Sequence, residues 1–135
     1  MQIQRYSGGI SREFPFNDMN DFANVRVSHS VLHPDWIAAE AARHYPLNGA
    51  VKAYLLYRGM NDVYLIEDRE TRYAMRVWRR GWRDVDVVKV ELDFLDYLRR
   101  RDFPASTPLR TRSGELYFKV GSPEGARAVA MYSWA

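Results

Sequence analysis

The spacing of apolar residues along the chain alternates between helical and strand-like patterns. Pro34 opens a stretch rich in helix formers, WIAAEAARHY, which ends before Pro46. Proline is favoured at the first position of a helix, and the acidic Asp35 suits the positive end of the helix dipole. The pattern therefore predicts a helix over about 34–44.

From Val51 onward the chain has the composition and alternation of half-buried strands. Three such segments, VKAYLLY, VYLIED and RYAMRVW, are joined by short turns, and TPLRT, ELYFKV and ARAVAMYSW follow after a second helical stretch. Tight turns between strand-like segments favour antiparallel neighbours. We therefore predict an α+β fold in which a mainly antiparallel sheet of five to six strands packs on one long helix, with an additional N-terminal helix.

The long helix, predicted over 83–101, carries a charge on its apolar side. At 100° per residue the side chains divide into an apolar arc (Val85, Val87, Val88, Leu92, Phe94, Leu95 and Leu98) and a polar one (Asp86, Lys89, Asp93, Asp96 and Arg100). Glu91 falls in the middle of the apolar arc. A carboxylate buried there without a partner is costly, so the helix must meet a cation on the sheet.

Arg76 is the expected partner of Glu91. In RYAMRVW, alternation places Arg76 on one face of the strand with Arg72, Ala74 and Trp78. We predict a hydrogen bond between Arg76 and Glu91, direct or through one water; if the pair is buried, Glu91→Ala costs about 3 kcal/mol. Two interpretations stay open: a structural ion pair or a rim glutamate, and a pair that holds a cation over the phosphates of a nucleotide.

The turn at 57–62, YRGMND, fits the second interpretation. Gly59 would allow the backbone to approach phosphates closely and to donate N–H groups to them. The same residues also suit an ordinary hairpin turn, so the turn alone decides nothing.

Composition limits the class of protein. The 135 residues are 47% hydrophobic and 27% charged, with no cysteine and a net charge of +3. This length and composition favour one soluble globular domain, and exclude disulfides and thiolate metal sites. The N-terminus lacks the apolar core of a secretory signal, and no run is long enough to span a membrane, so we expect a cytoplasmic protein. Residues 1–27 show no sustained periodicity and are interpreted as an extension that precedes a domain over 28–135.

Four segments taken in order, YRGMNDVYLI, RYAMRVWRRGWRDVDVV, ELDFLDYLRRRDFPASTPLRTRSGELY and AVAMYSWA, resemble the amino-terminal lobe of the aminoglycoside phosphotransferase family. That family includes choline-kinase-like and type II homoserine-kinase-like enzymes. The resemblance runs from about residue 50 to 135 and rests on the order and spacing of the segments, not on one motif. It implies a protein-kinase-like N-terminal lobe that ends at the hinge between lobes.

The resemblance also implies roles for individual residues. Gly59 and Asn61 would belong to the loop that positions the nucleotide, Arg76 to the basic site that contacts phosphate, and Glu91 to its helix partner. The hinge, where family members hold adenine through backbone hydrogen bonds, would be lined by Met131, Tyr132, Ser133, Trp134 and Ala135. The cofactor implied is ATP. Arg76 stands where the family usually has lysine, and a planar guanidinium differs from an ammonium in shape and in how it binds phosphate.

The catalytic part of such an enzyme is expected outside this chain. In the family, a second lobe brings a His-x-Asp catalytic loop and the ligands for Mg²⁺. The triplet His33-Pro34-Asp35 precedes the nucleotide elements and is interpreted as a helix start. We therefore expect the 135-residue chain to be inactive by itself, to bind ATP at most weakly, and to meet Mg²⁺ only with the C-terminal lobe.

Other functions and binding partners stay open. The chain could be a stand-alone nucleotide-binding or regulatory lobe, or an RNA- or DNA-binding module that uses the arginines of 72–83 with Trp78 and Trp82 as stacking surfaces. The charge-free end, residues 128–135, has strand character, and an open strand beside an apolar patch invites pairing. We predict that these residues contact the C-terminal lobe, in cis or in trans, or a second copy of the chain.

Overall fold

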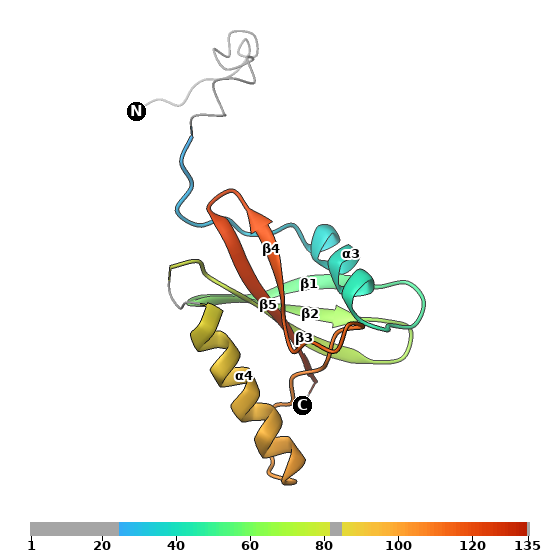
Figure 1. The fold of residues 1–135 in the computed structure, drawn as a ribbon. Helices are drawn as coiled ribbons and strands as arrows, with labels where there is room; N and C mark the ends of the chain where they lie inside the picture. The colour runs from blue at the N-terminus through green and yellow to red at the C-terminus, as the bar shows by residue number, and fades with distance from the viewer. Residues whose placement is uncertain (1–24, 82–84, 135) are drawn as a thin grey trace, which may run out of the picture.

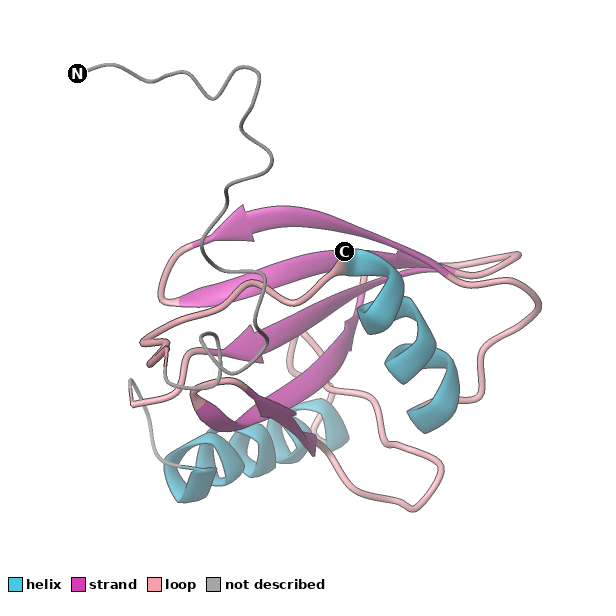
Figure 2. Cartoon of the chain, turned by 90° about the horizontal axis from the view of Figure 1, so that it is seen from above, coloured by secondary structure: helices cyan, strands magenta, loops and turns pink. Residues whose placement is uncertain are grey.

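The computed structural model describes residues 25–81 and 85–134. Within these residues a single five-stranded sheet has the order β1-β2-β3-β5-β4, and every neighbouring pair is antiparallel. The strands are β1 (Lys52–Arg58), β2 (Asn61–Glu67), β3 (Arg72–Trp78), β4 (Phe118–Ser122) and β5 (Gly125–Ser133). Helix α3 (Pro34–His44) lies on one face of the sheet and helix α4 (Val85–Arg100) on the other (Figures 1 and 2). The predicted α+β fold is confirmed.

Each face of the sheet has its own apolar core. On the α3 side, Ile37 and Ala41 pack against buried residues of four strands, among them Tyr64, Met75 and Val129. On the α4 side, two helix residues, Val88 and Leu92, pack with strand residues Trp78, Ala128, Ala130 and Tyr132. The alternation along β3 and β5 sends successive side chains to opposite cores.

Local signals in the sequence set the start of α3 and the β2–β3 turn. Pro34 occupies the start of α3, and the His33 ring accepts a hydrogen bond from the Asp35 backbone N–H over 3.1 Å. The predicted helix over 34–44 is therefore confirmed. In the turn after β2, the Asp68 carboxylate accepts hydrogen bonds from the backbone N–H groups of Glu70 and Thr71, both over 2.8 Å, which reverses the chain into β3.

Helix α4 packs on the sheet with a different arc from the one predicted. Asp96, expected on the solvent side, is buried with Val88 and Leu92, whereas the expected core residues Val87 and Phe94 are exposed. The prediction was wrong because hydrophobicity alone centred the arc near Glu91. Three arginines around Asp96 make its burial possible: Arg110 donates to it over 2.9 Å, and Arg99 and Arg100 approach within 3.3 and 3.2 Å.

The segment TPLRT, residues 107–111, was predicted as a strand but makes only an isolated bridge between Pro108 and Tyr132. Proline lacks the N–H that a strand must donate, so the ladder stops there. Two hydrogen bonds still hold the segment beside the end of β5: Leu109 N–H donates to the Met131 carbonyl over 2.8 Å, and Ser133 N–H donates to the Thr107 carbonyl over 3.1 Å. The sheet therefore has the lower of the two predicted strand numbers.

Candidate functional site

A recess of about 270 Å³ opens on the α4 side of the sheet, where β2, β3 and β5 meet the segment before β4. Val63 comes from β2, Ala74 and Arg76 from β3, and Ser106 from the connecting segment. The end of the described chain, Tyr132, Ser133 and Trp134, completes the lining. Helix α4 contacts β5 and leaves this part of the sheet accessible.

Arg76 supplies the charge of the recess, and α4 supplies its partner. The Arg76 Nη1 donates to Glu91 Oε1 over 3.2 Å, so the predicted hydrogen bond is confirmed. The two side chains remain 35% and 30% exposed, respectively, so this is a half-exposed ion pair and not a buried one. Solvent therefore screens the pair, and its contribution to stability is smaller than a buried pair would give.

Two aromatic rings flank the Arg76 guanidinium. Its Cζ lies 5.3 Å from the ring centroid of Trp78 and 5.3 Å from that of Tyr132, within the range of cation–π contacts. Burial raises the pKa of the Tyr132 hydroxyl to about 12, while the nearby Arg76 lowers it and Glu91 raises it further. Tyr132 is therefore neutral at physiological pH and offers Arg76 the face of an uncharged ring.

The expected hinge residues separate into two groups. Tyr132, like Met131, is buried, and Tyr132 is turned toward α4. Ser133 and Trp134 also line the recess, and Trp134 is 45% exposed. Ala135 lies outside the described residues. Since the Ser133 N–H already donates to Thr107, a ligand in the recess would have to use other backbone groups of this segment.

Gly59 and Asn61, expected to position a nucleotide, lie at the β1–β2 turn and do not line the recess. A Cβ added at Gly59 would stand 2.6 Å from the Tyr57 ring, but that ring is 62% exposed and can move aside, so this contact does not by itself require glycine. The Gly59 N–H donates to the Asn61 carbonyl over 3.1 Å, as in a tight hairpin. A phosphate-binding role for the turn stays a prediction.

Three lining residues were not anticipated: Val63, Ala74 and Ser106. Ala74 lies two residues before Arg76, so strand alternation already placed it on the same face, and the pairing of Val63 with Arg76 places Val63 beside it. Val63 could not be predicted as a lining residue because the register between β2 and β3 was not known from the sequence. Ser106 belongs to an irregular segment in which no periodicity marks the side facing the sheet.

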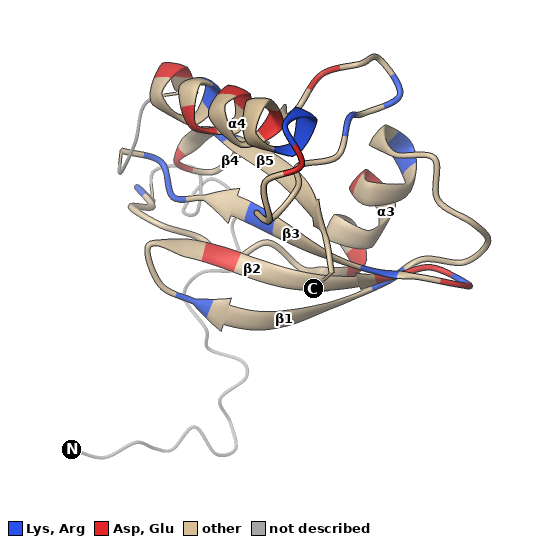
Figure 3. Ribbon diagram, turned by 90° about the horizontal axis from the view of Figure 1, so that it is seen from below, with Lys and Arg blue, Asp and Glu red and all other residues tan. Residues whose placement is uncertain are grey.

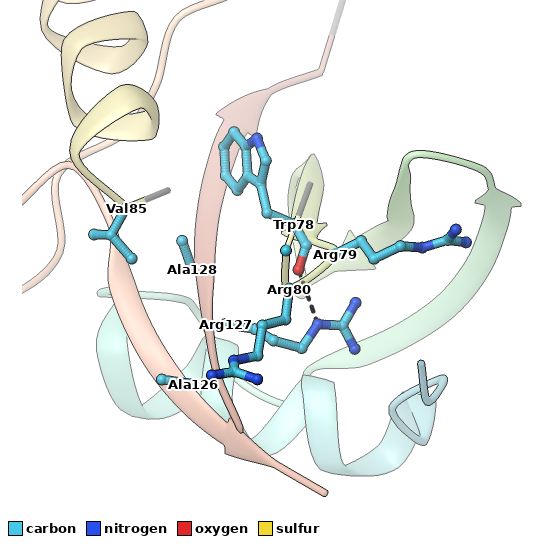
Figure 4. Close-up of a pocket in the computed structure, with 8 residues that line it drawn as sticks. Trp78, Arg79, Arg80, Val85, Ala126, Arg127 and Ala128 are labelled. Carbon is cyan, nitrogen blue, oxygen red and sulfur yellow. Dashed lines mark hydrogen bonds between the residues drawn. The ribbon is translucent and has the colours of Figure 1, made fainter. Parts of the chain in front are cut away.

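A larger recess of about 350 Å³ lies at the junction of β3 and α4, and three arginines, Arg79, Arg80 and Arg127, are among its lining residues. Figure 4 shows that Arg79 extends away from Arg80, so their charged ends do not converge on one point. Arg127 is held by the protein, because its Nε donates to the Trp78 carbonyl over 2.8 Å. These orientations give no common anion-binding position.

A buried polar network, which the sequence did not reveal, ties the segment before α3 to the sheet. Arg127 donates to the Ser30 carbonyl over 2.9 Å and to Asp62 over 3.2 Å. Ser30 donates to the Glu124 carboxylate through its backbone N–H and its hydroxyl, over 2.9 and 2.8 Å. His29 lies 3.5 Å from Asp62 and 3.8 Å from Glu124. The network fixes the ends of β2, β3 and β5 near the β1–β2 turn.

The surface charges argue against the RNA- or DNA-binding alternative. Trp78, proposed to stack on bases, is 3% exposed and belongs to the core under α4, so that role was wrong. Trp82 and Arg83 lie outside the described residues. Arg72 pairs with Glu67 over 2.9 Å and Arg76 with Glu91, and Figure 3 shows acidic and basic positions mixed along α4. Two of the five arginines of 72–83 are thus paired with carboxylates of the protein itself.

Comparisons with solved structures place this fold among kinase-like structures. A microcompartment-associated aminopropanol kinase matches with a TM-score of 0.64 and 28% identity, over 75% of this chain and 31% of that one. The amicoumacin kinase hAmiN, in a complex with AMP-PNP, Ca²⁺ and Ami, matches with a TM-score of 0.63 and 19% identity, over 75% and 30%. Spectinomycin phosphotransferase APH(9)-Ia, in complex with ADP and spectinomycin, matches with a TM-score of 0.57 and 10% identity, over 78% and 30%. The structure therefore corresponds to the N-terminal lobe region of kinase-like proteins.

Sequence comparison finds relatives that are themselves uncharacterised. The protein sll1119 of Synechocystis sp. is 31% identical over 107 residues, which are 79% of this chain and 30% of the relative. A protein of Deinococcus radiodurans is 38% identical over 106 residues, 78% of this chain and 31% of the relative. The chain thus spans about a third of the length of these relatives. No family model matches the chain.

Neither helix in the described part of the chain is long and apolar enough to cross a membrane. Among residues 25–81 and 85–134, no group of three His, Asp or Glu side chains is arranged to hold a metal ion.

Proposed function

We propose that this chain forms the ATP-binding lobe of a small-molecule phosphotransferase, an enzyme that transfers the γ-phosphoryl group of ATP to a hydroxyl of its substrate. The observation that carries the proposal is the half-exposed Arg76–Glu91 pair, which joins β3 to α4 at the wall of an open recess. Similarity to small-molecule kinases over three quarters of the chain supports it. Domain 28–135 would be the lobe, and residues 1–27 its extension.

The recess offers the contacts that a nucleotide needs. Val63 and Ala74 form an apolar floor on which a flat base could lie, beside the Ser133–Trp134 segment. Arg76 lies in the same lining and directs a cation toward the position of phosphates. Gly59 and Asn61 would approach the phosphates from the β1–β2 turn. Each of these contacts is part of the proposal.

The protein would need a second lobe for chemistry. The Glu91 carboxylate already accepts from Arg76, and the described residues offer no carboxylate cluster for Mg²⁺. The metal, which stabilises charge on the transferring phosphoryl group, and the catalytic base would therefore come from a C-terminal lobe in cis or in trans. The alternative is a stand-alone lobe that binds nucleotide without catalysis and has a regulatory role.

Nucleotide titration tests the proposal. We expect AMP-PNP to bind the 135-residue chain with a dissociation constant in the millimolar range, about 4 kcal/mol of binding free energy, because half of the phosphate cage is missing. Chemical-shift changes in NMR spectra should cluster at Val63, Ala74 and Ser133. The variant Arg76→Ala should weaken binding, whereas Arg72→Ala, whose guanidinium pairs with Glu67 near the other end of β3, should not. Shifts confined to other surfaces would contradict the proposal.

A further inference from the structure

We propose that Trp78 and Tyr132 form an aromatic clamp that fixes the plane of the Arg76 guanidinium and directs its Nε–Nη2 edge to a phosphate group. The proposal makes the two rings positioning residues and Arg76 an arginine-specific phosphate contact. The phosphate part rests on the proposed function. The existence of the clamp rests on the ligand-free geometry alone.

Strand register creates the space for the clamp. Arg76 is opposite Ala130, and Tyr132 is opposite Ala74, so each large side chain faces an alanine across the β3–β5 pair. Tyr132 is the diagonal neighbour of Arg76, and diagonal neighbours are within reach of long side chains. Trp78 follows two residues later on the same face of β3. The two rings therefore flank Arg76 from opposite directions along the strands.

The rings are fixed while the guanidinium between them is accessible. Trp78 and Tyr132 are 3% and 5% exposed, and both pack in the core that α4 closes. Arg76, within 5.3 Å of both ring centroids, keeps part of its side chain in the recess. Because close-packed core rings do not reorient freely, contact with both limits the rotation of the guanidinium plane.

The hydrogen bond to Glu91 leaves one edge of the guanidinium available. Nη1 donates to Glu91, and no group in the described part of the chain accepts from Nε or Nη2 of Arg76. In a planar guanidinium, the Nε–H and one Nη2–H point the same way and match two oxygens of a phosphate. Glu91 and the clamp together thus present a bidentate donor edge.

This arrangement accounts for arginine at residue 76, where the family that the chain resembles usually has lysine. An ammonium has no plane for the rings to orient and no two-donor edge. A lysine at residue 76 would keep the charge, and could keep the Glu91 contact, but would lose both features. Arg76→Lys should therefore weaken phosphate binding, although it conserves charge.

The first arm of the test needs no ligand. In the ¹⁵N-labelled 135-residue chain, the Arg76 Nε–H resonance should carry the ring-current shift of the clamp. Tyr132→Leu should move this resonance toward the position of an exposed arginine, and Tyr132→Phe, which keeps the ring, should not. Tyr97→Leu is the matched control, because it removes a ring 4.6 Å from Arg101 on the same helix that carries Glu91. An Arg76 resonance unchanged by Tyr132→Leu would overturn the clamp.

The second arm measures AMP-PNP binding. Tyr132→Leu should raise the dissociation constant about two- to fivefold, the effect of one partly exposed cation–π contact, and Tyr132→Phe should not. Arg76→Lys should raise it by a similar factor of about two- to fivefold, because one hydrogen bond of the two-donor edge is lost. If Tyr132→Leu does not fold, Arg76→Lys at its half-exposed position carries this arm, and equal affinity of Arg76→Lys and wild type would overturn the proposal. Failure of the wild type to bind AMP-PNP would refute the proposed function, and the first arm would still decide the clamp.

Discussion

Arg76 and Glu91 meet at the rim of the recess, and their exposure determines what the pair contributes to stability. Glu91→Ala should lower the free energy of unfolding by about 1 kcal/mol, because a half-exposed cation regains solvent when its partner is removed. A fully buried pair would cost about 3 kcal/mol or more. Urea unfolding measures the difference, with Asp93→Ala, which breaks an exposed pair with Lys89, as the control. A loss above about 3 kcal/mol for Glu91→Ala would show that the pair is effectively buried.

Local sequence patterns predicted the Arg76–Glu91 pair, but they cannot predict contacts between residues that are far apart in the chain. Helical periodicity located Glu91, and strand alternation located Arg76, since both signals act over a few residues. Arg127 is hydrogen-bonded to Asp62 and Ser30, which precede it in the chain by 65 and 97 positions, respectively. No periodicity encodes such distances. The role of Arg127 in this network therefore could not be predicted without the arrangement of the strands.

Among the elements, α4 shows how ion pairing can override hydrophobic periodicity. The sequence correctly predicted a helix there, but hydrophobicity placed Asp96 in solvent and Phe94 in the core. The observed helix is rotated so that Asp96 lies inward, where Arg110 of the following segment reaches it. Long-range ion pairs of this kind are not contained in a helical wheel. The prediction of a strand over 107–111 was wrong for a related reason. Its pairing depends on Pro108 and on the register with β5, which the local pattern does not contain.

Asp96 should accordingly anchor the C-terminal half of α4 to the segment before β4. Its side chain is 3% exposed, while Arg99, Arg100 and Arg110 are about half exposed. Asp96→Ala should destabilise the protein by about 2 to 3 kcal/mol, less than for a wholly buried cluster because the arginines regain water. Asp93→Ala on the exposed side of α4 is the matched control, with an expected loss below about 0.5 kcal/mol. Equal losses for the two variants in thermal unfolding would contradict this role.

At the scale of the whole molecule, the segment before α3 is held to the sheet through Glu124. Burial alone raises the pKa of this carboxyl, but hydrogen bonds, foremost those from Ser30, lower it from 4.5 to about 2. A depressed folded-state pKa stabilises the protein above pH 4.5, and this contribution is lost as the pH falls toward 2. Glu124→Gln should therefore cost about 1 to 2 kcal/mol at neutral pH and little near pH 2. Urea midpoints across this range, with the exposed Glu70→Gln as control, measure the effect; a loss independent of pH would contradict it.

Association with another copy or with a C-terminal lobe was predicted from an open strand edge at residues 128–135, and the structure instead offers an exposed apolar side chain there. Strand β5 pairs with β3 on one side. On the other side β4 covers it as far as Val129, and residues 107–109 bond to Met131 and Ser133, so residues 128–133 present no long open edge within the described chain. Among the described residues 128–134, Trp134 offers a large exposed apolar side chain beside the recess that could meet another surface. A second exposed apolar stripe runs along α4, with Val87, Val90, Phe94 and Tyr97. We expect concentration-dependent self-association, or capture of a separately produced C-terminal lobe, with the contact at Trp134.

Sedimentation over a range reaching about 100 μM tests this prediction, since mass action makes association concentration-dependent. Trp134→Ser should shift the equilibrium toward monomer, because it removes the large exposed apolar group at the end of the sheet. Phe94→Ser tests the stripe on α4 in the same way, at a site on a different element. Dissociation by Phe94→Ser alone would move the contact to α4. A wild-type chain that stays monomeric throughout, and does not bind a C-terminal lobe, would exclude both contacts.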